Sequence, residues 1–352
     1  MKTKSRLLSV VVPFVAVIVA FGIGCIIIAA LGSSPAQAIQ YLIIGAFGSA
    51  SNIATTLVKA TPLIFTGLCA CFAYRCGVFN LGGEGQFVVG ACVSVWVGVT
   101  WGFTGFAAIL TCLLLGALAG GIWGAIPGIL KITRGLNEII VSIMLNYVAI
   151  LFMGLLYTSL LREGSVPQTP AVPEATQLPR IFSDIRITWG VVIALTVAIV
   201  IHYFLFNTSG GFRLRAVGLN RTASRFNGFA VNKYTLASFI VSGGIAGLGG
   251  SVELLGTQYR LMSGFGQGFG FDGVAIALIA QLNPLATVFI AYFFAVLRTG
   301  ATTMQVGTGV PTSVIDIIQA MVIVFAVAGF ALVRMPQIRQ YISNRASKKE
   351  AV

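Results

Sequence analysis

Few residues of this chain could do chemistry, and several of them lie where an apolar segment would prefer none. Only nine residues are acidic. Four of these fall within or close to apolar segments: Glu84, Glu253, Asp272 and Asp316. A charge at membrane depth is costly, so each is a candidate functional residue. The alternative is a carboxylate that caps a helix, as at Asp272 and Asp316, or one that meets water, as at Glu253 near the outer end of its span.

Enzyme and metal-site patterns are absent from the sequence. It contains neither H-E-x-x-H nor G-x-S-x-G, and no glycine-rich loop followed by Lys-Ser/Thr, so ATP hydrolysis by a P-loop is excluded. The single histidine, His202, cannot make a metal site by itself. The six cysteines lie in or beside apolar runs without C-x-x-C spacing and are expected to be small buried side chains. We expect no catalytic residue, no metal and no cofactor in this chain.

Composition places the chain in a membrane. It is 57% hydrophobic and 9% charged, with a mean hydropathy of +0.96, whereas soluble domains carry about 25% charged residues. The apolar runs are continuous rather than alternating, which favours helices of about 20 residues over a β-barrel. The sequence therefore predicts an all-α polytopic fold with about ten transmembrane helices, at residues 7–31, 57–74, 85–102, 105–130, 138–160, 188–206, 235–256, 272–282, 285–299 and 313–333.

Basic residues predict the orientation. With both termini in the cytoplasm, all 22 Lys and Arg residues lie on the cytoplasmic side except six: Lys59, Arg162, Arg180, Arg186, Arg260 and Arg298. We expect one transmembrane domain over residues 1–352, with an uncleaved first span, an external loop at about 161–187, a cytoplasmic segment at about 207–234 and a cytoplasmic tail at 334–352. No basic stretch is interleaved with aromatic residues, so the net charge of +13 does not indicate nucleic acid.

The segment RCGVFNLGGEGQFVVGA, Arg75 to Ala91, predicts a bend between two apolar helices. Gly82, Gly83 and Gly85 allow the backbone to leave helical geometry, and the side chains of Asn80, Glu84 and Gln86 could satisfy exposed backbone groups. Such breaks are tolerated only inside protein or beside a water-filled cavity. QLNPLA, from Gln281, is a second break, and paired breaks in two halves indicate a transporter whose pathway lies between them.

Small residues repeat every four positions in two spans. The stripes are Gly116, Gly120, Gly124 and Gly128 in one span, and Gly243, Gly247 and Ser251 in another. Stripes of this kind allow close approach of helix backbones in lipid.

A basic cytoplasmic stretch, Leu214 to Tyr234, is too short for a domain. Thr222 to Phe229 could form a short helix bounded by Gly228. A short exposed helix on this face suits the docking of a motor subunit. The alternative is a basic loop that only anchors the protein at lipid headgroups.

Together these stretches resemble a family, the membrane permeases of ATP-binding-cassette importers for ribose-type sugars, branched-chain amino acids and nucleosides. FNLGGEGQ is similar to the N-I-G-A-E-G-Q motif of nucleoside-type members, and GLNEIIVSIMLNYVA to their T-T-x-M-L-N-Y-I-A element. AVGLNRTASRFNG is similar to the coupling segment A-x-G-x-N-x-x-A-A-x-x-x-G, with Ser224 in place of the second alanine. The resemblance covers about residues 58–333.

The resemblance implies a permease that works as a dimer in a prokaryotic plasma membrane. Its partners would be a cytoplasmic ABC ATPase, which holds the ATP and Mg²⁺, a second homologous permease chain, and an extracytoplasmic nucleoside-binding lipoprotein or protein. The candidate pathway residues are Asn80, Glu84, Gln86, Asn146, Tyr147 and Asn283. The candidate ATPase-coupling residues are Ala216, Gly218, Asn220, Arg221, Ala223, Ser224 and Gly228.

Two other functions fit the sequence. A permease for a simple sugar of the ribose type has the same motifs in outline. An ion-coupled secondary transporter would use Glu84 or Asp316 as its proton or sodium site and would need no ATPase. Glu84 is expected to pin the bend rather than to contact the substrate.

Overall fold

The computed structural model describes residues 2–102, 104–182 and 185–334. They form mainly α-helices: α1 (Lys2–Ala30), α2 (Pro35–Phe47), α3 (Ala50–Arg75), α4 (Gly83–Thr100), α5 (Phe106–Arg134), α6 (Glu138–Leu155), α7 (Trp189–Asn207), α8 (Ser209–Leu219), α9 (Arg221–Phe226), α10 (Val231–Glu253), α11 (Phe269–Ile279), α12 (Pro284–Thr308) and α13 (Ser313–Arg334). π-helical turns extend α6 (Leu156–Leu160) and α10 (Leu254–Gln258). Contacts divide these residues into unit 1, residues 2–49 with 296–334, and unit 2, residues 50–295.

The described helices confirm a polytopic all-α membrane protein but not ten spans. Six helices are long and apolar enough to cross a membrane, or seven if the bent pair α1 and α2 is one span. α11 has only 11 residues, and α4 carries Glu84 and Gln86 in its first turns, which lowers its hydropathy. The cytoplasmic placement of both termini stays a prediction, and the predicted tail lies outside the described residues beyond Arg334.

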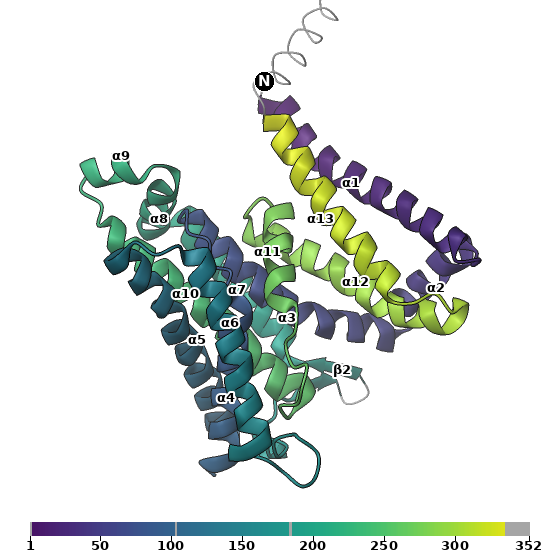
Figure 1. Cartoon of the computed structure of the whole chain (residues 1–352), viewed down its shortest axis with the longest axis horizontal. Helices are drawn as coiled ribbons and strands as arrows, with labels where there is room; N and C mark the ends of the chain where they lie inside the picture. Colours follow the sequence, from purple (N-terminus) through teal and green to yellow (C-terminus); the bar gives the residue numbers. More distant parts are fainter. Residues whose placement is uncertain (1, 103, 183–184, 335–352) are drawn as a thin grey trace, which may run out of the picture. The chain divides into compact units, whose positions relative to one another are not determined.

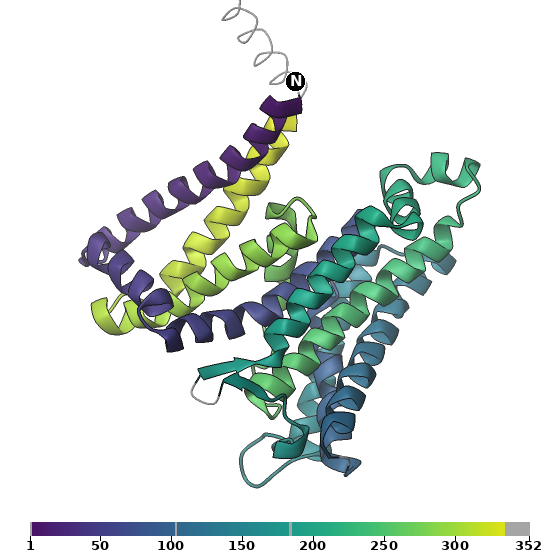
Figure 2. The ribbon, with the colours of Figure 1, turned by 180° about the vertical axis from the view of Figure 1, so that it is seen from behind.

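Unit 1 contains a helix that the sequence did not predict. The chain turns by 117° between the part of α1 from Val17 and α2. Gly32 has a φ of +80°, and Pro35 occupies the first turn of α2, so this break combines a left-handed residue with a helix start. α1 also packs along α13, as Figures 1 and 2 show.

Unit 2 is built on a tight contact among α4, α5 and α10. The two predicted glycine stripes face each other there: Gly120 of α5 lies against Gly243 and Gly247 of α10, so the close helix approach is confirmed. A Cβ at Gly120 would lie 2.7 Å from the Gly247 Cα. Next to this contact the Ser94 hydroxyl donates to the Ser251 hydroxyl at 2.7 Å. Backbones in contact leave no flexible side chain that could move aside for a larger residue.

Gly120→Leu is therefore expected to destabilise the protein by about 1–3 kcal/mol or more, the range for overpacked interiors. The matched control is Gly154→Leu on α6, where an added Cβ would meet only the Tyr157 hydroxyl at 3.9 Å. Thermal unfolding of the detergent-purified proteins measures both effects. Equal melting temperatures for the two variants would contradict the packing of α5 against α10.

The predicted external loop, about 161–187, does not stand free. Its described part carries a 3₁₀ turn (Glu174–Thr176) and the first strand of a small antiparallel hairpin, β1 (Arg180–Phe182) with β2 (Ile185–Thr188). Its backbone also bonds to the segment after α10: the Val172 N–H donates to the Tyr259 carbonyl at 2.8 Å and the Leu178 N–H to the Leu255 carbonyl at 2.9 Å. The loop is thus tied to unit 2, at the end opposite to α8 and α9 (Figures 1 and 2).

Candidate functional site

The predicted bend lies between α3 and α4 and is held by its own side chains. The Asn80 amide donates to the Gln86 Oε1 at 3.0 Å and to the Ser242 hydroxyl of α10 at 2.8 Å. Its Oδ1 accepts from the Gly82 N–H at 3.0 Å and from the Gln86 amide at 3.0 Å. Asn80 and Gln86 are both buried. These two candidate pathway residues are therefore brought together, and in this structure they satisfy the backbone and each other.

A third candidate, Asn146, ties α6 to the same bend. Its Oδ1 accepts from the Gly85 N–H at 2.8 Å, and its Nδ2 donates to the Leu81 carbonyl at 2.9 Å. The Gly85 N–H lies in the first turn of α4, where a helix has no internal acceptor. Asn146 thus caps a helix from another element, which sequence spacing alone does not reveal.

Glu84 lies buried where two helices begin. It sits in the first turn of α4, and Gly270 in the first turn of α11 packs directly on it, since a Cβ there would lie 2.6 Å from the Glu84 Cβ. Helix N-termini carry partial positive charge, which favours an anion between them. Among the described residues, Glu84 Oε2 has no hydrogen-bond partner.

The glycines of the bend act differently from the prediction. Gly82, Gly83 and Gly85 do not have positive φ angles, and Gly83 and Gly85 are already helical. They serve close packing: a Cβ at Gly85 would lie 2.9 Å from the Asn146 Cα. The left-handed residue is Gly77, with a φ of +69°, directly after α3.

Tyr147 and Asn283 do not join this cluster. Tyr147 is 63% exposed whereas Asn146 is 4% exposed, because successive residues of a helix point about 100° apart. The Asn283 Oδ1 accepts from the Leu285 N–H at 3.1 Å and so caps the start of α12. Of the other acidic candidates, Asp272 and Asp316 lie in the first turns of α11 and α13, as the capping alternative expects. The expectation of a water-exposed Glu253 is wrong, because this side chain is buried and accepts from Gln258.

Arg75 is the residue that the sequence analysis missed. Its Nε donates to the Leu282 carbonyl at 2.8 Å and its Nη2 to the Gln281 carbonyl at 3.2 Å. The residue that ends α3, before the first break, thereby holds the backbone of the second break. An arginine at the end of α3, in which Lys59 is the only other charged residue, was the available signal.

The predicted coupling residues lie on α8 and α9. The side chain of Asn220 caps α9 by accepting from the Ala223 N–H at 2.9 Å, and Gly228 ends the segment with a φ of +77°. Ser224 is buried, which explains a small residue there. α9 runs from Arg221 to Phe226 and so is shorter than the predicted 222–229, while α8 was not predicted as a helix.

A groove of about 460 Å³ opens on this segment. Its lining includes the candidates Ala216, Asn220, Ala223 and Ser224. Two apolar side chains in the segment stand in the open, since Leu219 is 89% exposed and Phe226 is 88% exposed. Large apolar side chains exposed on short helices such as α8 and α9 are typical of a protein interface.

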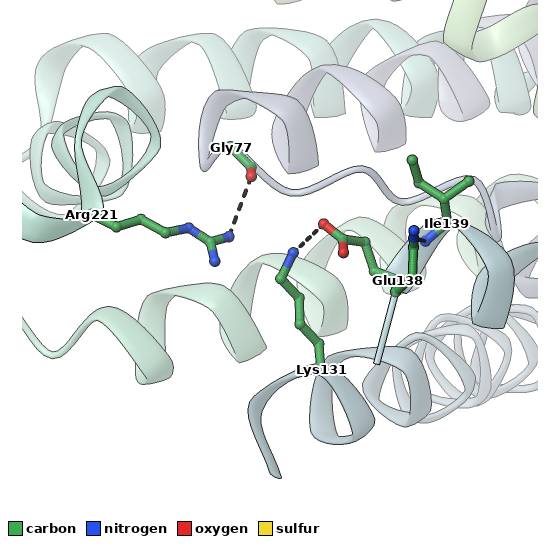
Figure 3. Close-up of polar contacts among 6 residues, drawn as sticks. Gly77, Lys131, Glu138, Ile139 and Arg221 are labelled. Carbon is green, nitrogen blue, oxygen red and sulfur yellow. Dashed lines mark hydrogen bonds and ion pairs between the residues drawn. The ribbon is translucent and has the colours of Figure 1, made fainter. Parts of the chain in front are cut away.

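The predicted coupling segment touches the bend directly. Gly218 lies against the backbone of Arg75, Cys76 and Gly77, and a Cβ at Gly218 would lie 2.9 Å from the Gly77 nitrogen. Figure 3 shows Arg221 of α9 reaching the Gly77 carbonyl, a hydrogen bond of 3.3 Å.

In the same view the ion pair of Lys131 and Glu138 joins the end of α5 to the start of α6. Asn137 caps α6 beside it by accepting from the Ile139 N–H at 2.9 Å. The end of α5, the start of α6 and the start of α9 therefore all lie near the turn at Gly77 (Figure 3).

Comparisons with known proteins give a family match and several relatives. Residues 52–327 match the family described as branched-chain amino acid transport system / permease component. The guanosine ABC transporter permease protein NupP of Bacillus subtilis is 34% identical over 98% of this chain and 99% of its own. The nucleoside ABC transporter permease protein NupB of Lactococcus lactis is 31% identical over 99% of each chain.

A third relative has a different substrate in its name. The glucose ABC transporter permease protein TsgB13 of Haloferax volcanii is 30% identical over 90% of this chain and 86% of its own. In B. subtilis and in L. lactis a second permease also matches, over 69% of this chain. No solved structure matches the chain significantly.

Proposed function

We propose that this chain, which belongs to the family of branched-chain amino acid transport system permease components, is the permease subunit of an ATP-binding-cassette importer that carries nucleosides. The observation that carries the proposal is the likeness, over nearly the whole length, to two permeases whose names specify guanosine and nucleosides. A simple sugar is the second candidate substrate, because the Haloferax relative is named for glucose at almost the same identity.

The polar bend suits a neutral solute. Asn80, Gln86 and Asn146 are neutral and already hydrogen-bonded within the protein, so they would not bind a passing solute tightly. A nucleoside has no charge that would require a fixed counter-charge. Glu84 lies between the starts of α4 and α11, which supports a role in pinning the bend.

The proposed mechanism is alternating access driven from the cytoplasmic face. ATP binding closes the two motor modules, and the groove over α8 and α9 follows them. Gly218 and Arg221 contact the turn at Gly77, so a movement of α8 and α9 reaches the bend without an intervening flexible loop. The permease then changes between outward-facing and inward-facing states.

The proposed partners follow from this mechanism. A cytoplasmic ABC ATPase binds α8 and α9 and holds ATP and Mg²⁺, so this chain needs no cofactor of its own. A second homologous permease completes the pathway, and the second matching permeases in two bacteria support a heterodimer. An extracytoplasmic nucleoside-binding lipoprotein or protein delivers the solute. The complex lies in a prokaryotic plasma membrane.

Gly228→Trp is expected to abolish uptake of radiolabelled guanosine or another nucleoside by cells that contain the complete transporter. A side chain there meets open space, so the change places bulk and a strained turn on the docking segment without touching the bend. The ATPase is expected to be lost when the permease is purified from these cells.

Gly102→Trp is the matched control, because Gly102 also has a positive φ of +66° and open space but lies beyond the far end of α4. It should keep the ATPase bound. Normal uptake by Gly228→Trp would overturn the coupling assignment and favour an ion-coupled transporter. Uptake of ribose or glucose but not of nucleosides by the wild type would leave the permease assignment intact and reject the substrate.

A further inference from the structure

Arg75 connects parts of unit 2 that are far apart in the sequence. Through its guanidinium it holds the carbonyls of Gln281 and Leu282, between α11 and α12, with bonds of 3.2 and 2.8 Å. Both donors belong to one planar group, so the two bonds fix its orientation as well as its position. Lysine has no such fork.

The turn that Arg75 holds is unusual. Gln281 and Leu282 both have positive φ angles, of 53° and 56°, and neither is a glycine. Residues with side chains remain in this conformation only where their surroundings over-determine it. Amide groups of the turn bond back into α11: the Leu282 N–H donates to the Ala277 carbonyl at 2.9 Å and the Gln281 N–H to the Leu278 carbonyl at 3.0 Å. The hydrogen bonds from Arg75 satisfy the carbonyls of the same two residues.

On its other side Arg75 meets the coupling segment through an aromatic ring. The Arg75 guanidinium carbon lies 5.2 Å from the centre of the Phe206 ring at the end of α7. The Arg215 guanidinium carbon, from α8, lies 5.1 Å from the same centre. Each distance is within the range of a cation–π contact. Arg215 also has a buried Nε without a hydrogen-bond partner among the described residues, so it is held mainly by packing.

A backbone contact runs parallel to this ring contact. Gly218, one turn after Arg215 on α8, rests on the carbonyl of Arg75 and on Cys76 and Gly77. A displacement of α8 therefore presses on the main chain of Arg75 as well as on its side chain. Closely packed interiors transmit such displacements because they have no space to absorb them.

We propose that Arg75 is a positioning residue that transmits the movement of α8 and α9 to the break at Gln281 and Leu282. This inference rests on the proposed ATP-driven function. In one state the fork holds the two carbonyls and the turn stays closed. When the ATPase moves α8, Arg75 shifts and the turn before α12 is released or tightened. Both breaks of the chain thus respond to one signal.

Amide hydrogen exchange of residues 277–287 tests the proposal in the purified complex of this chain with its ATPase and second permease. The complex is compared with and without trapped ATP, using an ATPase that binds but does not hydrolyse ATP. In the wild type we expect ATP to change exchange in this segment by about fivefold or more, the usual lower limit for coupled sites. In Arg75→Gln we expect the ATP-dependent difference to disappear while the ATPase remains bound. Arg75→Lys should not restore it, because a lysine cannot hold both carbonyls.

Two further variants keep the test decisive. Arg134→Gln is the matched control, since Arg134 also ends a helix, α5, but is exposed, and it should respond as the wild type does. If Arg75→Gln does not assemble, Phe206→Leu replaces it, because this variant removes the ring between the two arginines and keeps the hydrogen bonds of Arg75. We expect the ATP-dependent difference to be lost in Phe206→Leu as well, and an undiminished difference would overturn transmission through the ring and the side chain of Arg75.

The outcomes separate this inference from the proposed function. An undiminished ATP response in Arg75→Gln, or no response in the wild type, would overturn the role of Arg75 even if nucleosides are imported. A response that depends on Arg75 in a complex that imports no nucleoside would support the relay and reject the substrate.

Discussion

Asn146→Leu is expected to disrupt the bend and to lower the stability of the protein markedly. Leucine has the same branched skeleton as asparagine, with two methyl groups in place of the amide oxygen and nitrogen, but it can neither accept from the Gly85 N–H nor donate to the Leu81 carbonyl. Each stranded buried group costs about 1–3 kcal/mol. Gly85 is buried against α6, so water cannot replace the lost acceptor.

Tyr147→Leu is the neighbouring control for this prediction. Tyr147 is exposed on the same helix, and a leucine there should leave the melting temperature of the detergent-purified protein nearly unchanged. A similar loss of stability in both variants would contradict the capping role of Asn146. If Tyr147→Leu instead loses uptake at normal stability, the predicted pathway role of Tyr147 is supported, with its face completed by another chain of the assembled transporter.

Gly218→Leu is expected to abolish uptake by separating α8 from the turn at Gly77. A Cβ at Gly218 would lie 2.9 Å from the Cys76 carbonyl carbon and from the Gly77 nitrogen. These are backbone atoms, which cannot rotate away, so α8 must move or the turn must deform. The prediction is a nearly complete loss of nucleoside uptake, measured in the same cells as above, together with a lowered melting temperature.

Thr222→Leu is the control, because it adds similar bulk at an exposed position of α9. Its melting temperature should equal that of the wild type, which separates a steric effect on the turn from any effect of a larger side chain in the segment. Normal uptake by Gly218→Leu would show that the contact between α8 and the turn is not needed for coupling.

Local sequence was enough to predict the breaks and the close helix contacts. Gly120 and Gly247 belong to stripes of small residues spaced four positions apart. Such a stripe indicates a close helix contact even when the partner helix is not known. Likewise the amides and the carboxylate of FNLGGEGQ are costly in a membrane unless buried and paired, and Asn80 and Gln86 are indeed paired.

Other features depend on contacts between distant residues. The ten predicted spans came from hydropathy, which does not distinguish a crossing helix from the short α11 or from the bent pair α1 and α2. Hydropathy also did not reveal that loop 161–187 pairs with the segment after α10, since backbone hydrogen bonds carry no residue-type signal.

By itself, then, the sequence determined that the protein is a helical membrane protein with two polar breaks, because burial cost and periodicity are local properties. Its resemblance to permeases predicted the short coupling segment. Tertiary structure decided which groups serve those breaks. Arg75 binds Gln281 and Leu282, which lie 206 and 207 residues later in the sequence. Asn146 rather than Tyr147 faces the bend because of the rotation of α6. The local sequence favours neither the contact of Arg75 with the distant turn nor the orientation of Asn146 toward the bend. Only the packing of the helices determines them.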